Sequence, residues 1–298
     1  MKTWWALVAR NRKLFFRDKG MLFSSLITPV ILIVLYATFL AKVYKDSFQS
    51  SLPDVMQVSD KLLNGTVAAQ LTAALLAVSC VTVTFCVNLT MVQDKASGAR
   101  KDFDVSPVKR PLLYVGYFCS TVLNSLMVNL LALVLSLIYI RTMGWYLSAW
   151  DVASVILDIF LLVMFGAVLS SIICYPLKTQ GQMSAVGTIV SAGYGFICGA
   201  YMPISNFGDG LQKTLLFLPG TYGTSLLKNH MLRGPFEEMK EQGFPKDVVT
   251  QIAGSLDCRP ELFGNVVSVG QMIAIMIGSI VVLGAVYLFI TALGKKRL

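Results

Sequence analysis

The chain has 298 residues, of which 55% are hydrophobic and only 14% are charged. Since about 25% of the residues in an ordinary soluble domain are charged, this composition argues against a water-soluble globular protein, as does the mean hydropathy of +0.68. The formal net charge is +9. The basic residues lie between apolar segments, so we expect a membrane and no nucleic acid as the partner of this charge.

The cysteines and the single histidine offer little material for catalysis. Five of the six cysteines lie in apolar stretches without a CxxC pair, and His230 lies outside the apolar segments, where we expect a solvated side chain. The nearest approach to a Walker A sequence, at 208–214, lacks the glycine directly before Lys213. The sequence therefore predicts no disulfide framework, no metal site and no nucleotide bound by this chain, which we expect not to be an enzyme. The six cysteines are Cys80, Cys86, Cys119, Cys174, Cys198 and Cys258.

Residues 1–20 carry an amphipathic pattern. Apolar side chains recur at helical spacing while basic side chains share another face, which predicts a helix lying in the inner headgroup layer of the membrane. The alternative is a positively charged flank that only sets topology. The apolar residues are Trp4, Leu7, Val8, Leu14 and Phe15, and the basic ones are Arg10, Lys13 and Arg17.

Six stretches are long and apolar enough to cross about 30 Å of hydrocarbon. We therefore expect an all-α integral membrane protein whose residues 1–298 form a single transmembrane domain. The first stretch has no convincing cleavage site and is expected to remain as an anchor. With the N-terminus placed inside, most Lys and Arg residues fall on the inner side, so both termini are expected to be cytoplasmic. The stretches are 21–41, 67–92, 112–140, 151–175, 184–202 and 269–293.

The inner loop at 93–111 combines a helix breaker with a helix start. Gly98 can end one helix, and Ser106-Pro107 is a favourable start for the next, because serine caps helices and proline suits the first turn. These signals predict a short cytoplasmic helix between two long membrane helices. It either docks on a partner and transmits movement, or forms part of a solvated basic loop that fixes topology.

The fourth and fifth stretches contain polar and aromatic residues of interest. Asp158 is the one ionisable residue well inside a span, about two turns from its outer end, and we favour its satisfaction by outer water or a neighbouring hydroxyl over substrate contact. Tyr194, Phe196 and Tyr201 either line a pathway for an amphiphile or anchor the chain at the interface. The glycines of the fifth stretch suit either a homodimer seam or packing within the chain.

The outer segment at 203–268 is punctuated by prolines. After Pro245, the apolar residues Val248, Val249, Ile252 and Leu256 predict one face of a short amphipathic helix. We expect a small helical cap that acts as a structural lid and is too short to be a catalytic domain.

Two groups of motifs resemble the type-2 ABC transporter permeases. One is a glycine followed nine positions later by proline, here Gly98 and Pro107 in a Ser-Pro-Val-x-Arg context; the other is the succession Gly199 to Pro203, then Pro219 to Tyr222, then Leu232-Arg233. In that family the inner loop forms a coupling helix contacted by the ATPase, and the later motifs form an outer gate. The chain departs from the family pattern at Ala96, where an acidic residue is usual, and at Arg100, Lys101 and Asp104, where apolar residues are usual. The resemblance implies ATPase contacts at Asp94, Gly98, Arg100, Ser106, Pro107, Val108 and Arg110, and a gate at Gly199, Pro203, Pro219 and Tyr222.

The resemblance also implies a function. The chain would be the permease subunit of an ATP-driven exporter, with ATP and Mg held by two copies of a separate ATPase and the pathway completed by a second permease copy or a sister subunit. The expected location is a bacterial plasma membrane. We favour a hydrophobic or amphiphilic substrate such as a drug, antibiotic, lipid-like compound or peptide, with a polysaccharide or glycolipid as the alternative. Replacing Gly98 or Pro107 is expected to uncouple transport while the protein still folds.

A rival function from another class is an ion-coupled secondary transporter or a channel. Such proteins usually carry several intramembrane carboxylates or histidines, or interrupted helices in an inverted repeat. Asp158 alone matches the first pattern, and no convincing repeat matches the second.

Overall fold

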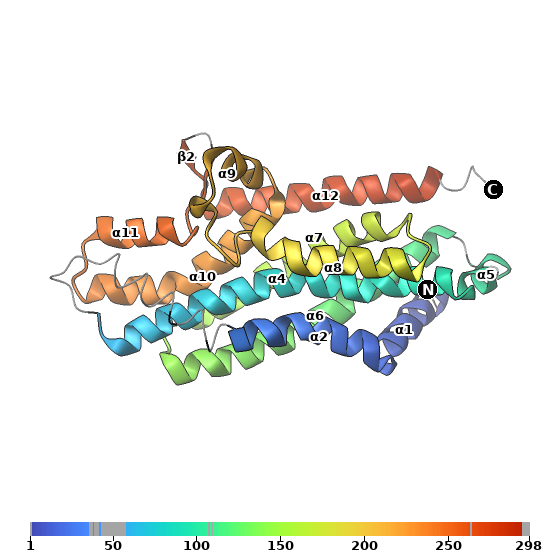
Figure 1. Ribbon diagram of the computed structural model, residues 1–298, viewed down its shortest axis with the longest axis horizontal. Coiled ribbons are helices and arrows are strands. Elements are labelled where there is room, and N and C mark those ends of the chain that lie inside the picture. Colours follow the sequence, from blue (N-terminus) through green and yellow to red (C-terminus); the bar gives the residue numbers. More distant parts are fainter. Residues whose placement is uncertain are drawn as a thin grey trace.

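The computed structural model describes residues 2–35, 38, 42, 58–106, 108, 110–262 and 264–293, and the part of the chain that it describes is helical except for one short hairpin. The membrane helices expected from the sequence form a bundle along one long axis (Figure 1). The elements are α1 (Lys2–Arg17), α2 (Lys19–Leu35), α4 (Asp60–Ala96), α5 (Ala99–Asp104), α6 (Arg110–Met143), α7 (Ala149–Cys174), α8 (Gln180–Ile197), η2 (Ile204–Asn206), α9 (Asp209–Leu216), α10 (Pro219–Glu241), α11 (Lys246–Ser255), β1 (Glu261–Leu262), β2 (Asn265–Val266) and α12 (Val269–Leu293).

Helix α4 is the central element of the bundle. It packs against α2, α6, α7, α8 and α10, and nearly all of its side chains are buried. At 1.5 Å per residue its 37 residues extend about 55 Å, which exceeds the roughly 30 Å of a hydrocarbon core. In Figure 1, α1 and α5 lie toward one end of the bundle and α11 lies at the opposite end, so α4 connects the two ends.

Each expected span coincides at least in part with a described helix, although not every one of these helices is long and apolar enough to cross a membrane. Four described helices are long and apolar enough: α4, α6 from Pro111, α7 and α12. Helix α8 ends at Ile197 and not near residue 202, because Cys198 and Gly199 turn the chain back. Helix α2 is apolar and runs into residues that are not described, so the first expected span lies partly outside the described residues. The count of six spans remains a prediction.

Helix α1 has the expected amphipathic character, with two exceptions. Leu7, Val8 and Phe15 are buried against the bundle, whereas Leu14 is 37% exposed. Arg10 leaves the expected basic face and points inward, because a buried carboxylate on α4 needs a cationic partner.

The outer segment is more ordered than its prolines suggest. Helix α10 continues for 23 residues through Pro235, although proline removes one helical hydrogen bond. Packing against α4 and α7 outweighs that loss. At Gly234, α10 lies directly against the segment between α6 and α7, so that an added Cβ would overlap the Tyr146 carbonyl. The expected helix after Pro245 is present as α11, with Val249 and Ile252 buried, and the hairpin of β1 and β2 was not expected from the sequence.

Candidate coupling loop and outer gate

The inner loop has the expected break at Gly98. Helix α4 ends at Ala96, and Gly98 adopts a left-handed conformation with φ of +82° immediately before α5. The hydroxyl of Ser106 donates to the Phe103 carbonyl and so closes the end of α5. Helix α6 begins only at Arg110, so Ser106 does not cap it as expected. Pro107 lies outside the described residues, and Val108 donates its amide to the Ser106 hydroxyl.

Asp94 joins three helices at the end of the bundle where α5 lies. Arg10 of α1 donates two hydrogen bonds to its carboxylate, Nη1 to Oδ2 at 2.7 Å and Nη2 to Oδ1 at 2.9 Å. The Tyr117 hydroxyl of α6 donates to the same Oδ2. Bidentate arginine–carboxylate pairs are among the strongest hydrogen-bonded contacts in proteins, and this one is largely shielded from water on the Asp94 side. The hydrogen bond to Asp94 raises the pKa of Arg10, which therefore remains charged.

Helix α5 is attached to the same contacts. The Arg10 guanidinium lies over the Phe103 ring, 5.0 Å from its centroid. We call Arg10, Asp94, Phe103 and Tyr117 the Asp94 cluster. Arg100, three residues before Phe103 on α5, donates to the Tyr114 hydroxyl at 3.1 Å. The short helix is thereby fixed to α1 and α6 by side chains as well as by the backbone.

Lys95 fixes α7 at the same end. Its ammonium group donates to the carbonyls of Cys174, at 3.4 Å, and Leu177, at 3.3 Å, and also to the Tyr175 carbonyl. These carbonyls lie at and just after the C-terminus of α7, where a cation is favourable to the helix dipole. At this end of the bundle α4 is therefore attached to α7 through Lys95, as well as to α1 and α6 through Asp94.

The expected gate residues lie on both sides of α9. Gly199 has φ of +71°, and a Cβ at this position would lie 2.8 Å from Ile204, so the turn after α8 requires glycine. Pro203 precedes η2, and Pro219 is the first residue of α10. The Tyr222 hydroxyl donates to the Leu216 carbonyl at 2.7 Å, which closes the end of α9.

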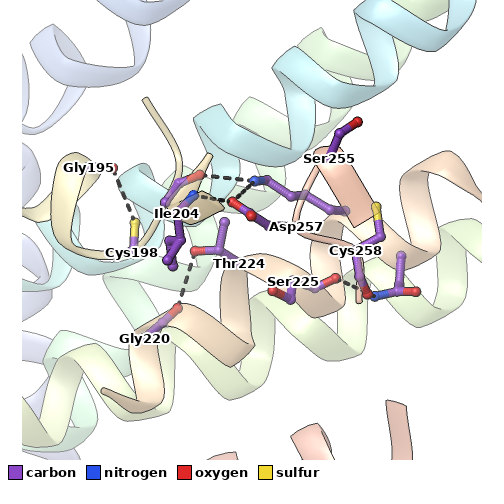
Figure 2. A network of polar contacts seen from close by, with 12 residues as sticks. Gly195, Cys198, Ile204, Gly220, Thr224, Ser225, Ser255, Asp257 and Cys258 are labelled. Carbon is purple, nitrogen blue, oxygen red and sulfur yellow. Dashed lines mark hydrogen bonds and ion pairs between the residues drawn. The ribbon is translucent and has the colours of Figure 1, made fainter. Parts of the chain in front are cut away.

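A buried ion pair connects this turn to α10 and to the segment after α11. The Lys228 ammonium group donates to the Gly199 carbonyl at 2.9 Å and lies 3.4 Å from Asp257 Oδ2. The same oxygen accepts the Ile204 amide at 2.7 Å, so Asp257 lies between Ile204 and α10 in Figure 2. We call Lys228, Asp257, Gly199 and Ile204 the Lys228 network. Sequence reasoning missed it; the only signal was a lysine directly after the apolar pair Leu226-Leu227.

The neighbouring residue Asn229 adds a second link to the segment after α11. Its amide group donates to the Ser225 carbonyl at 2.8 Å and to the Cys258 carbonyl (Figure 2). Helix α10 therefore binds both the Asp257 side chain and the backbone carbonyl of the next residue. Burial raises the pKa of the Cys258 thiol to about 12, so this cysteine is an inert part of the packing.

The expectation for His230 is wrong. Its Nδ1 lies 2.6 Å from Asp158 Oδ2, and the Asp158 side chain is fully buried. Asp158 Oδ2 thus has an imidazole as its partner and not water or a hydroxyl, while the buried Oδ1 has no hydrogen-bond partner among the described residues. The choice between structural satisfaction and substrate contact stays a prediction. Three residues further along α10, Arg233 forms an ion pair with Asp151 and donates to the Ser148 hydroxyl at the start of α7. A polar face of α10 is therefore paired with carboxylates from distant segments.

The three candidate pathway aromatics do not form one surface. Phe196 and Tyr201 pack edge to face with ring centroids 5.1 Å apart, and Tyr201 covers Gly195. Tyr194 is buried elsewhere, against Gly220 at the start of α10. Packing within the chain accounts for Gly195, whereas a Cβ on Gly187 or Gly193, also in α8, would meet open space.

Within the described residues, no group of three His, Cys, Asp or Glu side chains is placed to hold a metal ion. The ABC-2 type transporter family model matches residues 2–232, a range that runs from α1 through the inner loop and into α10. Neither the comparison with curated proteins nor the comparison with solved structures found a match. The chain belongs to the ABC-2 type transporter family, whose members are multi-pass membrane permeases that lack a nucleotide-binding domain of their own and generally work with an ATP-binding subunit.

Proposed function

We propose that this chain is the permease subunit of an ATP-driven exporter in which residues 93–111 receive the movement of a separate ATPase. The observation that carries the proposal is the Asp94 cluster. Through Arg10, Phe103 and Tyr117 it joins α5 to α1, α4 and α6 at one end of the bundle. A force applied to α5 reaches all of these helices because the contacts are short and partly shielded from water.

The outward surface of α5 suits a protein partner. Lys101 and Asp102 are exposed, and Val105 is 88% exposed directly after the helix. Two residues of α5 that contact other helices are Phe103, which contacts Arg10, and Arg100, which contacts Tyr114. They lie on a different face of this short helix from its exposed residues. In this proposal the ATPase binds the exposed side and holds the ATP and Mg, and the two nucleotide sites of a complete transporter require two ATPase copies.

The pathway is completed by a second permease copy or a sister subunit, and the segment at 203–268 forms its outer gate. The open space around Gly187 and Gly193 supports a neighbouring chain beside α8. At the gate, the Lys228 network holds the turn at Gly199 against α10, which leaves this turn able to move only if a buried ion pair separates. Alternating access then consists of inner closure by the ATPases and release of this outer contact.

Export across a bacterial plasma membrane is what the resemblance to the family implies. A hydrophobic or amphiphilic substrate agrees with the apolar side chains that the helices present. Drugs, antibiotics, lipid-like compounds and peptides all belong to this class. A polysaccharide or glycolipid is the alternative substrate.

The proposal is tested by co-expression with the candidate ATP-binding protein and purification through a tag on this chain. We expect co-purification and vanadate-sensitive ATPase activity in liposomes. Asp94→Asn removes the charge that Arg10 and Tyr117 share, and we expect it to lower coupled transport about tenfold, as loss of about 1.4 kcal/mol of contact energy would. Asp247→Asn, exposed on α11 at the opposite end of the bundle, is the matched control for the loss of a carboxylate.

The contradicting result is equal transport by the Asp94→Asn variant and the unchanged protein, with both folded. Purification of the chain without any ATPase, even when the two proteins are expressed together, would also overturn the proposal.

A further inference from the structure

An apolar cavity of about 740 Å³ lies between α4, α7, α8, α12 and the start of α10. Its volume falls within the roughly 300–1,000 Å³ of typical small-molecule sites. None of its lining residues is charged; they include Phe165, Leu169, Tyr194, Gly220, Gly278 and Val282. The cavity is therefore suited to the apolar body of a ligand and unsuited to an ion.

The cavity has a buried floor and an exposed mouth. Phe85 and Tyr194 on the floor are 2% and 9% exposed, whereas Ile189 of α8 and Val282 of α12 at the mouth are 70% and 62% exposed. Helix α12 is one of the apolar helices able to cross a membrane, so the mouth between it and α8 opens where lipid chains lie. A ligand that enters here comes from the bilayer.

One polar group on the floor lacks a partner. The Tyr194 hydroxyl is buried and has no hydrogen-bond partner among the described residues. It lies beside the start of α10, since a Cβ added to Gly220 would lie 2.7 Å from this oxygen. Pro219 has no amide hydrogen and Leu218 makes no side-chain cap, so the Gly220 amide also lies in a helix turn without an intrahelical acceptor.

We propose that this cavity binds an uncharged amphiphile that enters from the bilayer. The apolar chain of the ligand fills the space between α8 and α12. An acceptor on the ligand, such as an ester or ether oxygen, accepts a hydrogen bond from the Tyr194 hydroxyl and faces the start of α10. A buried hydroxyl without a partner is costly, and an acceptor on the ligand removes that cost. A charged headgroup is disfavoured because no lining residue would neutralise it.

This inference deepens the proposed function by naming a substrate site, and it rests on that function only for the role of the site in transport. Binding is therefore measured on the full chain alone, in lipid nanodiscs without an ATPase. The probe is a long-chain fatty acid methyl ester with a photoreactive diazirine in its chain, and the comparison probe is the alkane of the same length. After illumination, mass spectrometry locates the labelled peptides. Failure of coupling to an ATPase would leave this measurement unaffected.

We expect the ester to label α8 and α12 at the cavity, with excess unlabelled ester removing the label. Tyr194→Phe is expected to lower ester labelling about fivefold, as loss of one hydrogen bond would, and to leave alkane labelling unchanged. Gly278→Phe places a ring in the open space at the cavity and should abolish labelling there by both probes. Gly284→Phe is the matched control, because Gly284 is on the same helix, also has open space around it and does not line the cavity.

Two results would overturn the inference. The first is labelling spread evenly over exposed apolar residues such as Leu131 and Ile138 of α6, which would indicate ordinary contact with bulk lipid. The second is cavity labelling that Gly278→Phe does not reduce. If the ester and the alkane respond alike to Tyr194→Phe, the assigned hydrogen bond is wrong.

Discussion

Arg10 shows how tertiary structure changes the role of a single side chain. Helical spacing places it with Lys13 and Arg17 on a basic face, yet in the fold its guanidinium binds Asp94, 84 positions away. An unpaired carboxylate at a buried site is costly, and a bidentate arginine offsets that cost. Lys13 and Arg17 remain exposed, so the basic face of α1 is formed without Arg10.

The backbone conformation at position 98 requires glycine, whereas the space around it would admit a side chain. The φ of Gly98 is +82°, and an added Cβ would meet no atom within 4 Å. We therefore expect Gly98→Ala to destabilise the loop by about 1–2 kcal/mol, the cost of a left-handed conformation in a residue with a side chain. Gly98→Asn should cost less, because asparagine tolerates this conformation. For both variants, the free energy of unfolding is measured by chemical denaturation, and coupled transport is measured alongside it.

The control for Gly98 is Gly181→Ala. Gly181 also has open space around it but lies within α8, where alanine is the better helix former. Equal stability of the Gly98→Ala and Gly98→Asn variants, or greater stability of Gly98→Ala than of the unchanged protein, would show that the backbone conformation is not the constraint.

The contact of Asp158 with His230 separates the permease from the rival ion-coupled transporter. If the pair only satisfies a buried carboxylate, replacing both residues in Asp158→Asn/His230→Gln should leave ATP-driven transport within about twofold, since a neutral pair retains one hydrogen bond. An ion-coupled transporter would lose its activity with this change. Proton flux into liposomes without nucleotide, and transport with nucleotide, are measured on the same preparations.

Among the helices, those whose apolar pattern is uninterrupted were predictable. The expected span at 269–293 coincides with α12, and that at 151–175 differs from α7 by only a residue or two. The sequence predicted only short gate helices in this region, and it did not predict α10 as one helix of 23 residues. The side chains of Lys228, His230 and Arg233 contact Asp257, Asp158 and Asp151, which come from segments far away in the sequence. A local pattern cannot contain those contacts.

The order of the outer segment depends on the pair of Lys228 and Asp257. Their side chains are 1% and 11% exposed, so removing one partner leaves a buried charge, at a cost of about 3–5 kcal/mol. We expect Lys228→Met and Asp257→Asn each to accelerate proteolysis of residues 198–207. Asparagine is used at position 257 because φ there is +58°.

The double variant tests whether the two residues act together. The combined effect of Lys228→Met and Asp257→Asn on stability should be smaller than the sum of the single effects, since the second change removes the charge that the first leaves unpaired. Additive effects would contradict a direct interaction. Lys246→Met, on the exposed surface of α11, controls for loss of a lysine.

At the scale of the whole molecule, α4 links the loop at 93–111 to the helix that carries Lys228. Asp94 lies near its C-terminal end, and along its length it packs against α10. The sequence predicted the helix break at Gly98, where the backbone is left-handed, but not the start of α6 at Arg110. It did not reveal the Asp94 cluster, because Arg10 and Tyr117 come from other helices, or the cavity at Tyr194, which side chains of five helices line. The central claim is that α5 receives the movement of the ATPase at the inner end.

Site-specific photo-crosslinking tests that claim most directly. Benzoylphenylalanine replaces Lys101, which is exposed on α5, in the chain co-expressed with the candidate ATPase in membranes. The control position is Lys246, exposed on α11 at the opposite end of the bundle (Figure 1). The account predicts a crosslink to the ATPase from position 101 and none from position 246. A crosslink from position 246, or none from position 101 while the two proteins co-purify, would contradict it.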